Sequence, residues 1–297
     1  LDVRVSNLPT VNGEKCVIRI LATGDVGVRK ITDLGMTPYN YDRFSRLIKV
    51  PQGVMLVTGP TGSGKTTTLY AALGELAKPN VNVITVEDPV EKNIEGINQC
   101  QVNAKAGMTF AAALRSILRQ DPDIVMVGEM RDSETADIGI RAAITGHLVL
   151  STLHTNDAAS TVIRLVDMGV APYMVATSLI GVIAQRLVKV LCPECKRPRM
   201  STSEENELMG VPQSIQIYEP GGCPSCNNTG YKGRTAIHEI IHCTTKVSSI
   251  IASGGTKEEI EKAARENGTK LLRDNASALV QAGQSSIDEL IRTTYTV

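Results

Sequence analysis

The segment best suited to chemistry is a glycine-rich stretch that ends in lysine and threonine. Residues 59–66 read Gly-Pro-Thr-Gly-Ser-Gly-Lys-Thr and fit the pattern G-x-x-x-x-G-K-[ST], between an apolar run and a predicted helix. In such a loop the backbone amides hold phosphates, the lysine reaches the β and γ oxygens, and the threonine binds Mg²⁺. A glycine-rich turn with a solvated lysine is the alternative, which this context disfavours. We expect a nucleoside triphosphate site, with Thr66 as the Mg²⁺ ligand, formed by Gly59, Pro60, Thr61, Gly62, Ser63, Gly64, Lys65, Thr66 and Thr67.

Two acidic clusters follow later apolar runs of the chain. The first is Glu87-Asp88-Pro89-Val90-Glu91, after the run 81–86, and the second contains Glu129, after the run 124–127. Strand ends of an open α/β sheet are where such folds bind ligands. Carboxylates there can hold the Mg²⁺ shell and orient an attacking water. Either cluster alone fits a solvated strand end, but beside a phosphate loop we take Glu87, Asp88, Glu91 and Glu129 as site candidates.

Histidines bracket one short predicted strand. His147 and His154, two of the four histidines in the chain, stand on either side of the run that begins at Leu148. A single histidine near a strand end is usually structural. Two that flank one strand of the same sheet favour a role in sensing the phosphate or a neighbouring subunit.

Four of the seven cysteines form two Cys-x-x-Cys pairs, Cys192/Cys195 and Cys223/Cys226. Four thiolates can occupy the corners of a tetrahedron and close a structural Zn²⁺ site. A redox dithiol is the rival, but no thioredoxin-like pattern precedes these pairs. The three other cysteines are expected to be buried thiols.

The elements that must position these residues form an alternating pattern. Apolar runs at 54–57, 81–86, 124–127 and 148–150 alternate with helical patterns at 66–77, 110–119, 133–144 and 158–168. Strands that are apolar on both faces and separated by helices predict a parallel sheet covered on both sides. A hairpin is expected within 1–22, and helices at 39–49, at 175–191 and through the tail, where capping-box patterns begin at Thr256 and Ser286.

Composition excludes several classes of protein. The 297 residues carry 31 Lys+Arg and 31 Asp+Glu, so no net field attracts nucleic acid, and seven Tyr with two Phe leave little for stacking bases. No apolar run approaches the ~20 residues that cross a bilayer. An odd number of scattered thiols favours a reducing cytoplasm. We therefore expect no nucleic-acid partner and no membrane span.

Together, the order of these motifs resembles one family. The phosphate loop, the acidic box at 87–91, the segment Val127-Gly128-Glu129-Met130-Arg131-Asp132 and the histidine box are similar to those of the secretion ATPase superfamily. These are the GspE/PilB-type motors of type II secretion and type IV pilus assembly. The resemblance covers essentially the whole chain. It implies a RecA-like P-loop core with a parallel-rich sheet, a tetracysteine zinc insertion, a helical C-terminal subdomain and a homo-hexamer.

The resemblance also implies roles for single residues. Glu91 matches the acidic-box glutamate assigned as general base, and Glu129 matches the Mg²⁺-linked glutamate. Glu87 and Asp88 fill the rest of the acidic box. Arginines supplied by another domain tie phosphoryl transfer to domain motion, although a surface salt bridge is the alternative for each. Two arginines resemble those of the preceding domain that meet the γ-phosphate, and two resemble others near the nucleotide: Arg4, Arg19, Arg164 and Arg234.

The resemblance implies a division of the chain. Residues 1–22 are the last strands of a preceding N-terminal domain, 23–30 a linker, 31–190 the ATPase core, 191–232 the four-cysteine element and 233–297 the helical C-terminal subdomain. The implied protein is a Mg²⁺-dependent ATP hydrolase with structural Zn²⁺ that drives pilus assembly or type II secretion. It is cytoplasmic, peripheral at the inner face of the cytoplasmic membrane, and partnered by an inner-membrane platform protein.

The same motifs leave three alternatives open. The paired cysteines disfavour the pilus-retraction branch, which lacks them. A related hexameric ATPase of DNA uptake or of another secretion route shares the motifs. A nucleic-acid motor also uses a RecA-like core, and a nonenzymatic nucleotide-gated scaffold needs only the phosphate loop.

Overall fold

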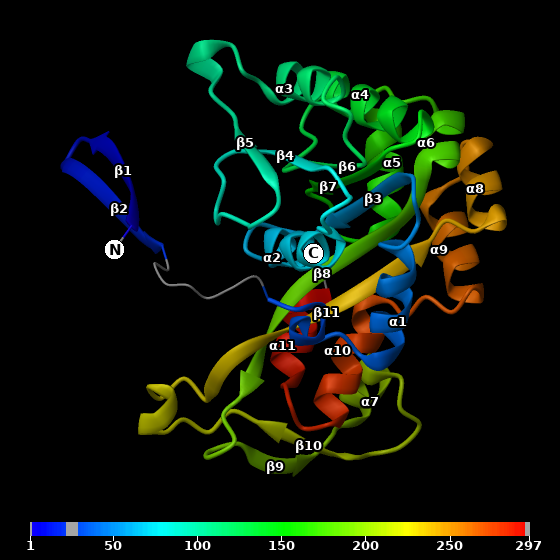
Figure 1. The fold of residues 1–297 in the computed structure, drawn as a ribbon. Coiled ribbons are helices and arrows are strands. Elements are labelled where there is room, and N and C mark those ends of the chain that lie inside the picture. The colour runs from blue at the N-terminus through cyan, green and yellow to red at the C-terminus, as the bar shows by residue number, and fades with distance from the viewer. Residues whose placement is uncertain (1, 22–28, 295–297) are drawn as a thin grey trace.

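The chain is built around one large sheet. The computed structural model describes residues 2–21 and 29–294, without the side chains of residues 2, 4 and 19–21. The sheet contains β3 (Gly53–Thr58), β4 (Val83–Glu87), β5 (Asn98–Gln101), β6 (Ile124–Val127), β7 (Leu148–Leu153), β8 (Leu179–Leu191) and β11 (Tyr231–His242). Their order is β11-β8-β3-β7-β6-β4-β5, and all neighbours are parallel except β11, which is antiparallel to β8 (Figure 1). The expected parallel-rich α/β fold is confirmed.

Helices cover both faces of this sheet. They are α1 (Pro38–Leu47), α2 (Lys65–Leu76), α3 (Phe110–Ile117), α4 (Ser133–Ile144), α5 (Ala158–Asp167), α6 (Pro172–Ser178), α7 (Ser203–Met209), α8 (Thr245–Ala252), α9 (Lys257–Glu266), α10 (Leu272–Gln281) and α11 (Ile287–Thr294). Alternate residues of β3 belong to opposite cores. Val54 and Leu56 pack with α4 and α5, whereas Met55 and Val57 pack with α1 and α2. Because the strand is buried on both faces, it reads as a continuous apolar run.

The expected helix over 175–191 is wrong. Helix α6 ends at Ser178, and the next 13 residues form the strand β8. This strand pairs with β3 and β11, and its residues 181–185 are buried in succession. Both faces are therefore covered there, and its apolar pattern has no period of two. Gly181 marks the close packing, because a Cβ there would lie 2.7 Å from the Leu47 methyls and 2.9 Å from the Ile241 carbonyl oxygen.

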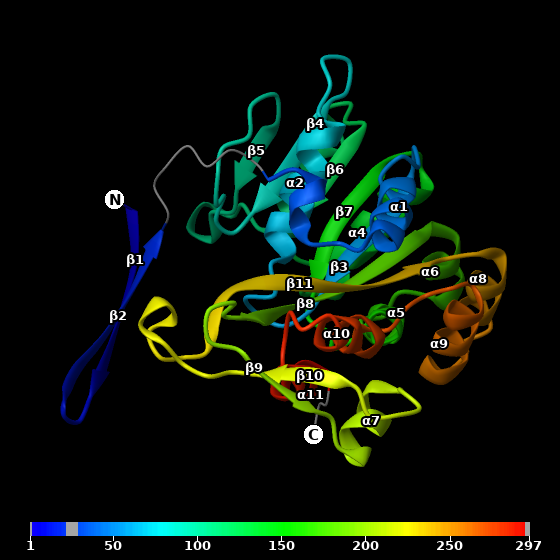
Figure 2. The ribbon, with the colours of Figure 1, turned by 90° about the horizontal axis from the view of Figure 1, so that it is seen from below.

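Between β8 and β11 the chain forms the four-cysteine element. Strands β9 (Arg197–Met200) and β10 (Gln216–Glu219) pair antiparallel, and α7 lies between them in sequence. Figure 2 shows this element beside α10 and α11. The segment after 232 was expected to be helical, but its first residues belong to β11 in the central sheet, and the helices begin with α8. The capping box of Thr256 and Glu259 is present at the start of α9.

The amino-terminal hairpin is confirmed. Strand β1 (Asp2–Thr10) pairs antiparallel with β2 (Gly13–Leu21). Most of the expected linker, 23–30, lies outside the described residues. Cys16 is exposed and Cys100 is half-buried, so the expectation of buried thiols is wrong for these two. The Cys243 thiol is buried, and burial raises its pKa to about 12. Within the described part of the chain, no helix has the length and apolar character needed to cross a membrane.

Candidate functional site

The glycine-rich loop connects β3 to α2 in a conformation that demands glycine at its start. Gly59 has φ +147°, and a Cβ there would lie 2.3 Å from the carbonyl oxygen of Gln185 and 2.7 Å from the Ser63 hydroxyl. Gly64 precedes α2 with φ +88°. The loop therefore passes close against β8 and delivers the amino end of α2 to the carboxyl edge of the sheet. This is the strand–loop–helix arrangement that binds phosphates.

Gln185, on β8, hydrogen-bonds to both the glycine-rich loop and the helix that follows it. Its Nε2 donates to the Ser63 carbonyl at 2.8 Å, and its Oε1 accepts from the Thr68 hydroxyl at 2.6 Å. The side chain is 2% exposed, so both bonds are made away from water. Sequence reasoning missed this residue because it sits in the run that was expected to be a helix. A polar residue inside a buried apolar run was the only signal.

The Lys65 ammonium lies on the loop that it follows. Its Nζ donates to the Gly59 carbonyl at 2.8 Å and to the Pro60 carbonyl at 3.2 Å. Burial lowers the pKa of Lys65, and the charge of Glu129 opposes that effect. A cation held by two carbonyls can exchange them for phosphate oxygens, which are stronger acceptors.

A cavity of about 500 Å³ brings most of the predicted site together. Its wall takes in the phosphate loop from Thr61 to Thr67 and the ends of three neighbouring strands. The predicted residues among its lining are Thr61, Gly62, Ser63, Gly64, Lys65, Thr66, Thr67, Glu87, Asp88, Glu91, Glu129 and His154. Residues far apart in sequence meet here because the carboxyl ends of parallel strands share one edge of the sheet.

Glu129 is held by an arginine and a histidine at the cavity wall. Its Oε2 accepts from the Arg131 Nε at 2.9 Å, and its Oε1 lies 3.2 Å from the His154 Nε2. Thus the histidine after β7 reaches the carboxylate after β6. Arg131 was part of the quoted motif but was not predicted as a site residue. Two donors on one carboxylate give it a defined orientation toward the phosphate loop.

Other predicted residues lie away from this cavity. His147 stands at the opposite end of β7, where its Nδ1 is 2.9 Å from the Ala142 carbonyl. Arg164 is exposed near the end of α5 and lines neither this cavity nor the one beside it. Arg4 and Arg19 face each other across the hairpin register, and their side chains lie outside the described residues.

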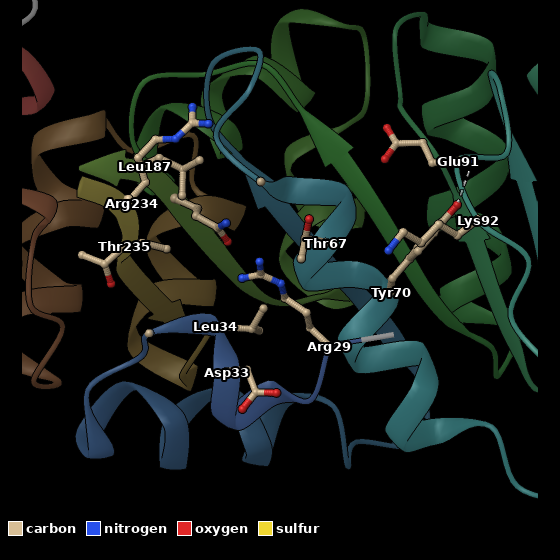
Figure 3. Close-up of a pocket in the computed structure, with 15 residues that line it drawn as sticks. Arg29, Asp33, Leu34, Thr67, Tyr70, Glu91, Lys92, Leu187, Arg234 and Thr235 are labelled. Atoms are coloured by element: carbon tan, nitrogen blue, oxygen red, sulfur yellow. Dashed lines mark hydrogen bonds between the residues drawn. The ribbon is translucent and has the colours of Figure 1, made fainter. Parts of the chain in front are cut away.

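A second cavity, of about 670 Å³, opens beside the first and shares Gly64, Thr67 and Glu91 with it. Arg234, on β11, lines this cavity together with Arg29 from the segment before α1 (Figure 3). The two cavities form a continuous recess around the amino end of α2. Its phosphate-loop side is acidic and polar, and its far side carries arginines.

The four paired cysteines lie together at the base of the element between β8 and β11. Their sulfur atoms are all within 4.8 Å of one another. The Cys192–Cys223 and Cys195–Cys226 sulfurs are 3.8 Å apart, and the Cys223–Cys226 sulfurs 3.7 Å. A tetrahedron with Zn–S bonds of ~2.3 Å has edges of about 3.8 Å. The donor set and its spacing fit a four-thiolate metal site.

Comparison with known proteins agrees with this geometry. The family model for type II/IV secretion system proteins matches residues 1–292. The chain belongs to this family. It is 49% identical over 296 residues to the type II secretion system ATPase E of Vibrio cholerae serotype O1, an alignment that covers 99% of this chain and 58% of that protein. The type IV pilus assembly ATPase PilB of Thermus thermophilus is 47% identical over 298 residues, covering 99% of this chain and 33% of that protein.

A solved structure shares the fold of this type II/IV secretion family member. The pilus retraction motor PilT with bound ADP aligns with a TM-score of 0.73 and 26% identity, over 99% of this chain and 74% of that one. The predicted resemblance and the RecA-like fold are confirmed. The chain spans little more than half, 58%, of the length of the Vibrio cholerae relative.

Proposed function

We propose that this chain is the ATPase part of a motor that couples Mg²⁺-dependent ATP hydrolysis to type II secretion or type IV pilus assembly. One observation carries the proposal: the phosphate loop, Glu91 and Glu129 line a single cavity. The relatives named above supply the two machines, and their similar identities of 49% and 47% favour both equally. The retraction motor is 26% identical, which favours secretion or assembly over retraction.

The site residues divide the chemistry among them. The loop amides and Lys65 bind the β- and γ-phosphates. Thr66 and Glu129 are the residues that would hold Mg²⁺, which would supply positive charge to offset that of the phosphates. Glu91 is exposed at the cavity and acts as the base that orients the attacking water. Glu129 contacts both Arg131 and His154, so a change of charge at the phosphates alters the electrostatic environment of both side chains.

The second cavity has room for the nucleoside, with Arg234 on its wall. Arg4 and Arg19 are assigned to the γ-phosphate as arginines supplied by the preceding domain. Arg164 lines neither cavity, so its role near the nucleotide requires another domain or a neighbouring copy. A homo-hexamer supplies such copies. We place this assembly in the cytoplasm, at the inner face of the cytoplasmic membrane, where an inner-membrane platform protein receives the motion.

The four-thiolate site holds a structural Zn²⁺ in this proposal. Four thiolates leave no open coordination position, so the metal stabilises the element and takes no part in hydrolysis. Cys192, Cys195, Cys223 and Cys226 are the ligands, and their spacing supports this assignment.

Substitution of Lys65 tests the proposed function. Lys65→Ala removes the ammonium that meets the phosphates, and we expect steady-state ATP hydrolysis to fall by roughly 100-fold or more. Lys78→Ala, an exposed lysine beyond the end of α2, is the matched control and should hydrolyse ATP normally. Phosphate release by the 297-residue chain is the measurement. Unchanged hydrolysis by Lys65→Ala would refute the site.

A further inference from the structure

The loop that carries Glu91 is fixed by side chains of other elements. It follows β4 and has no strand or helix of its own. Two glutamines of β5, Gln99 and Gln101, hydrogen-bond to the backbone of this loop. Gln101 Oε1 accepts from the Val90 amide at 3.2 Å, and Gln99 Oε1 accepts from the Ile94 amide at 2.7 Å. Gln99 Nε2 also donates to the Lys92 carbonyl at 3.0 Å.

Tyr70 of α2 holds the same loop at Glu91 itself. Its hydroxyl oxygen accepts from the Glu91 backbone amide at 3.2 Å (Figure 3). The Lys92 backbone amide also hydrogen-bonds to that oxygen. The tyrosine is 4% exposed. Burial, with a contribution from Glu87, raises the pKa of Tyr70, so the hydroxyl keeps its proton and donates it.

Glu87 is the acceptor that orients this phenol. The Tyr70 hydroxyl donates to Glu87 Oε2, while the Thr85 hydroxyl at 2.6 Å and Gln99 Nε2 at 3.1 Å donate to Oε1. The glutamate is 2% exposed. The Glu91 amide can only donate, so the phenol must turn its lone pairs toward that amide and its single proton toward Glu87.

We propose that Tyr70 is a positioning residue that sets where Glu91 stands relative to the bound phosphates, with Glu87 as its anchor. The role rests on the proposed function, in which Glu91 acts on the attacking water. Helix α2 begins at Lys65, so one rigid element carries both the phosphate contacts and the hydroxyl that holds the base. A displacement of about 1 Å at such a base costs up to roughly 100-fold in rate.

Tyr70→Phe in the 297-residue chain removes only the hydroxyl. We expect kcat for ATP hydrolysis to fall by about 10-fold or more, and KM and the Kd for ADP to stay within about twofold. Tyr173→Phe is the matched control, because that tyrosine is 65% exposed on α6, and it should change neither constant. A normal kcat in Tyr70→Phe overturns the proposal.

A double-mutant cycle shows whether Tyr70 acts through Glu91. In the Glu91→Gln background the base is already absent, so adding Tyr70→Phe should lower kcat by no more than about twofold. If the two losses multiply, Tyr70 acts independently of Glu91 and the proposal is wrong.

A second pair separates positioning from stability. Tyr70→Phe leaves the buried Glu87 carboxylate without one donor, which destabilises the fold. Thr85→Val removes another donor to the same carboxylate, and Thr85 does not line the cavity, so the melting temperature should fall similarly while kcat stays near normal. If Thr85→Val lowers kcat as much as Tyr70→Phe does, the role is structural and the proposal fails.

Full hydrolysis by Lys65→Ala would overturn the proposed function itself, whereas an inactive Lys65→Ala beside a normal Tyr70→Phe overturns only the role of Tyr70.

Discussion

The two candidate carboxylates, Glu91 and Glu129, have different surroundings. Glu129 is half-buried, and both of its oxygens face cationic or proton-donating side chains, from Arg131 and His154. Glu91 is exposed, and its backbone amide donates to the Tyr70 hydroxyl. A carboxylate engaged by two partners suits a metal shell, whereas one whose oxygens face solvent in the cavity can take a proton from water.

Glu91→Gln tests this difference. The amide keeps the size of the side chain but is a poor base, so we expect kcat to fall by roughly 10²–10⁴-fold while ATP still binds. Nucleotide affinity and single-turnover hydrolysis are the measurements. Glu95→Gln, an exposed glutamate farther along the same loop, is the matched control and should behave as the unaltered chain. Normal turnover by Glu91→Gln would place the base elsewhere.

Sequence alone predicted the residues whose chemistry is contained in a local motif. The phosphate loop, Glu91 and Glu129 belong to this group, because a motif and a strand end place them without knowledge of the sheet order. Gln185 and Tyr70 could not be found in this way. Each contacts a segment more than 20 positions away in the sequence: Gln185 and Ser63 are 122 positions apart, and Tyr70 and Glu91 are 21 positions apart. Their partners are brought to them by the tertiary fold.

Among the elements, β8 contributes most to the geometry of the phosphate loop. It pairs with β3 on one side and β11 on the other, so its position is fixed along its length. Gln185 projects from it onto the loop, and its own carbonyl lies against Gly59. The prediction of a helix here failed because a strand buried on both faces has the same apolar composition as a buried helix.

Gln185→Leu tests these contacts with the loop. Leucine fills a similar volume but leaves the Ser63 carbonyl and the Thr68 hydroxyl without their buried partner, which costs about 2 kcal/mol. We expect a lower melting temperature and a weaker affinity for ADP. Gln213→Leu, in an exposed loop before β10, is the control and should alter neither. An unchanged affinity would show that the loop holds its shape without β8.

At the scale of the whole molecule, the alternation of apolar runs and helical patterns predicted the sheet and its covering helices. It could not predict that β11 returns antiparallel to the edge of the same sheet after the four-cysteine element. Pairing between segments separated by a long insertion leaves no local pattern in the sequence. For this reason the predicted start of the helical C-terminal segment was too early and fell within β11.

Metal analysis tests the insertion. We expect about one Zn per chain, and a chelator should lower the melting temperature by roughly 10 °C. Cys226→Ser removes one ligand and should lose the metal, while Cys16→Ser, an exposed cysteine of the hairpin, should retain it. A metal-free preparation with an unaltered melting temperature would contradict the four-thiolate assignment.

The place of the cysteines in the topology has a consequence for how the sheet assembles. Leu191 and Tyr231 are paired where β8 ends and β11 begins, and the cysteines lie just inside that pair. Cys192 and Cys223 are separated by 31 positions in the sequence. Closing a loop of that length costs roughly 3 kcal/mol of chain entropy. A metal ion held by the four cysteines would offset this entropic cost before the two strands align. The ends of the insertion would then be held together as in a short turn, and β8, which supports the glycine-rich loop, could pair with β11 early in folding.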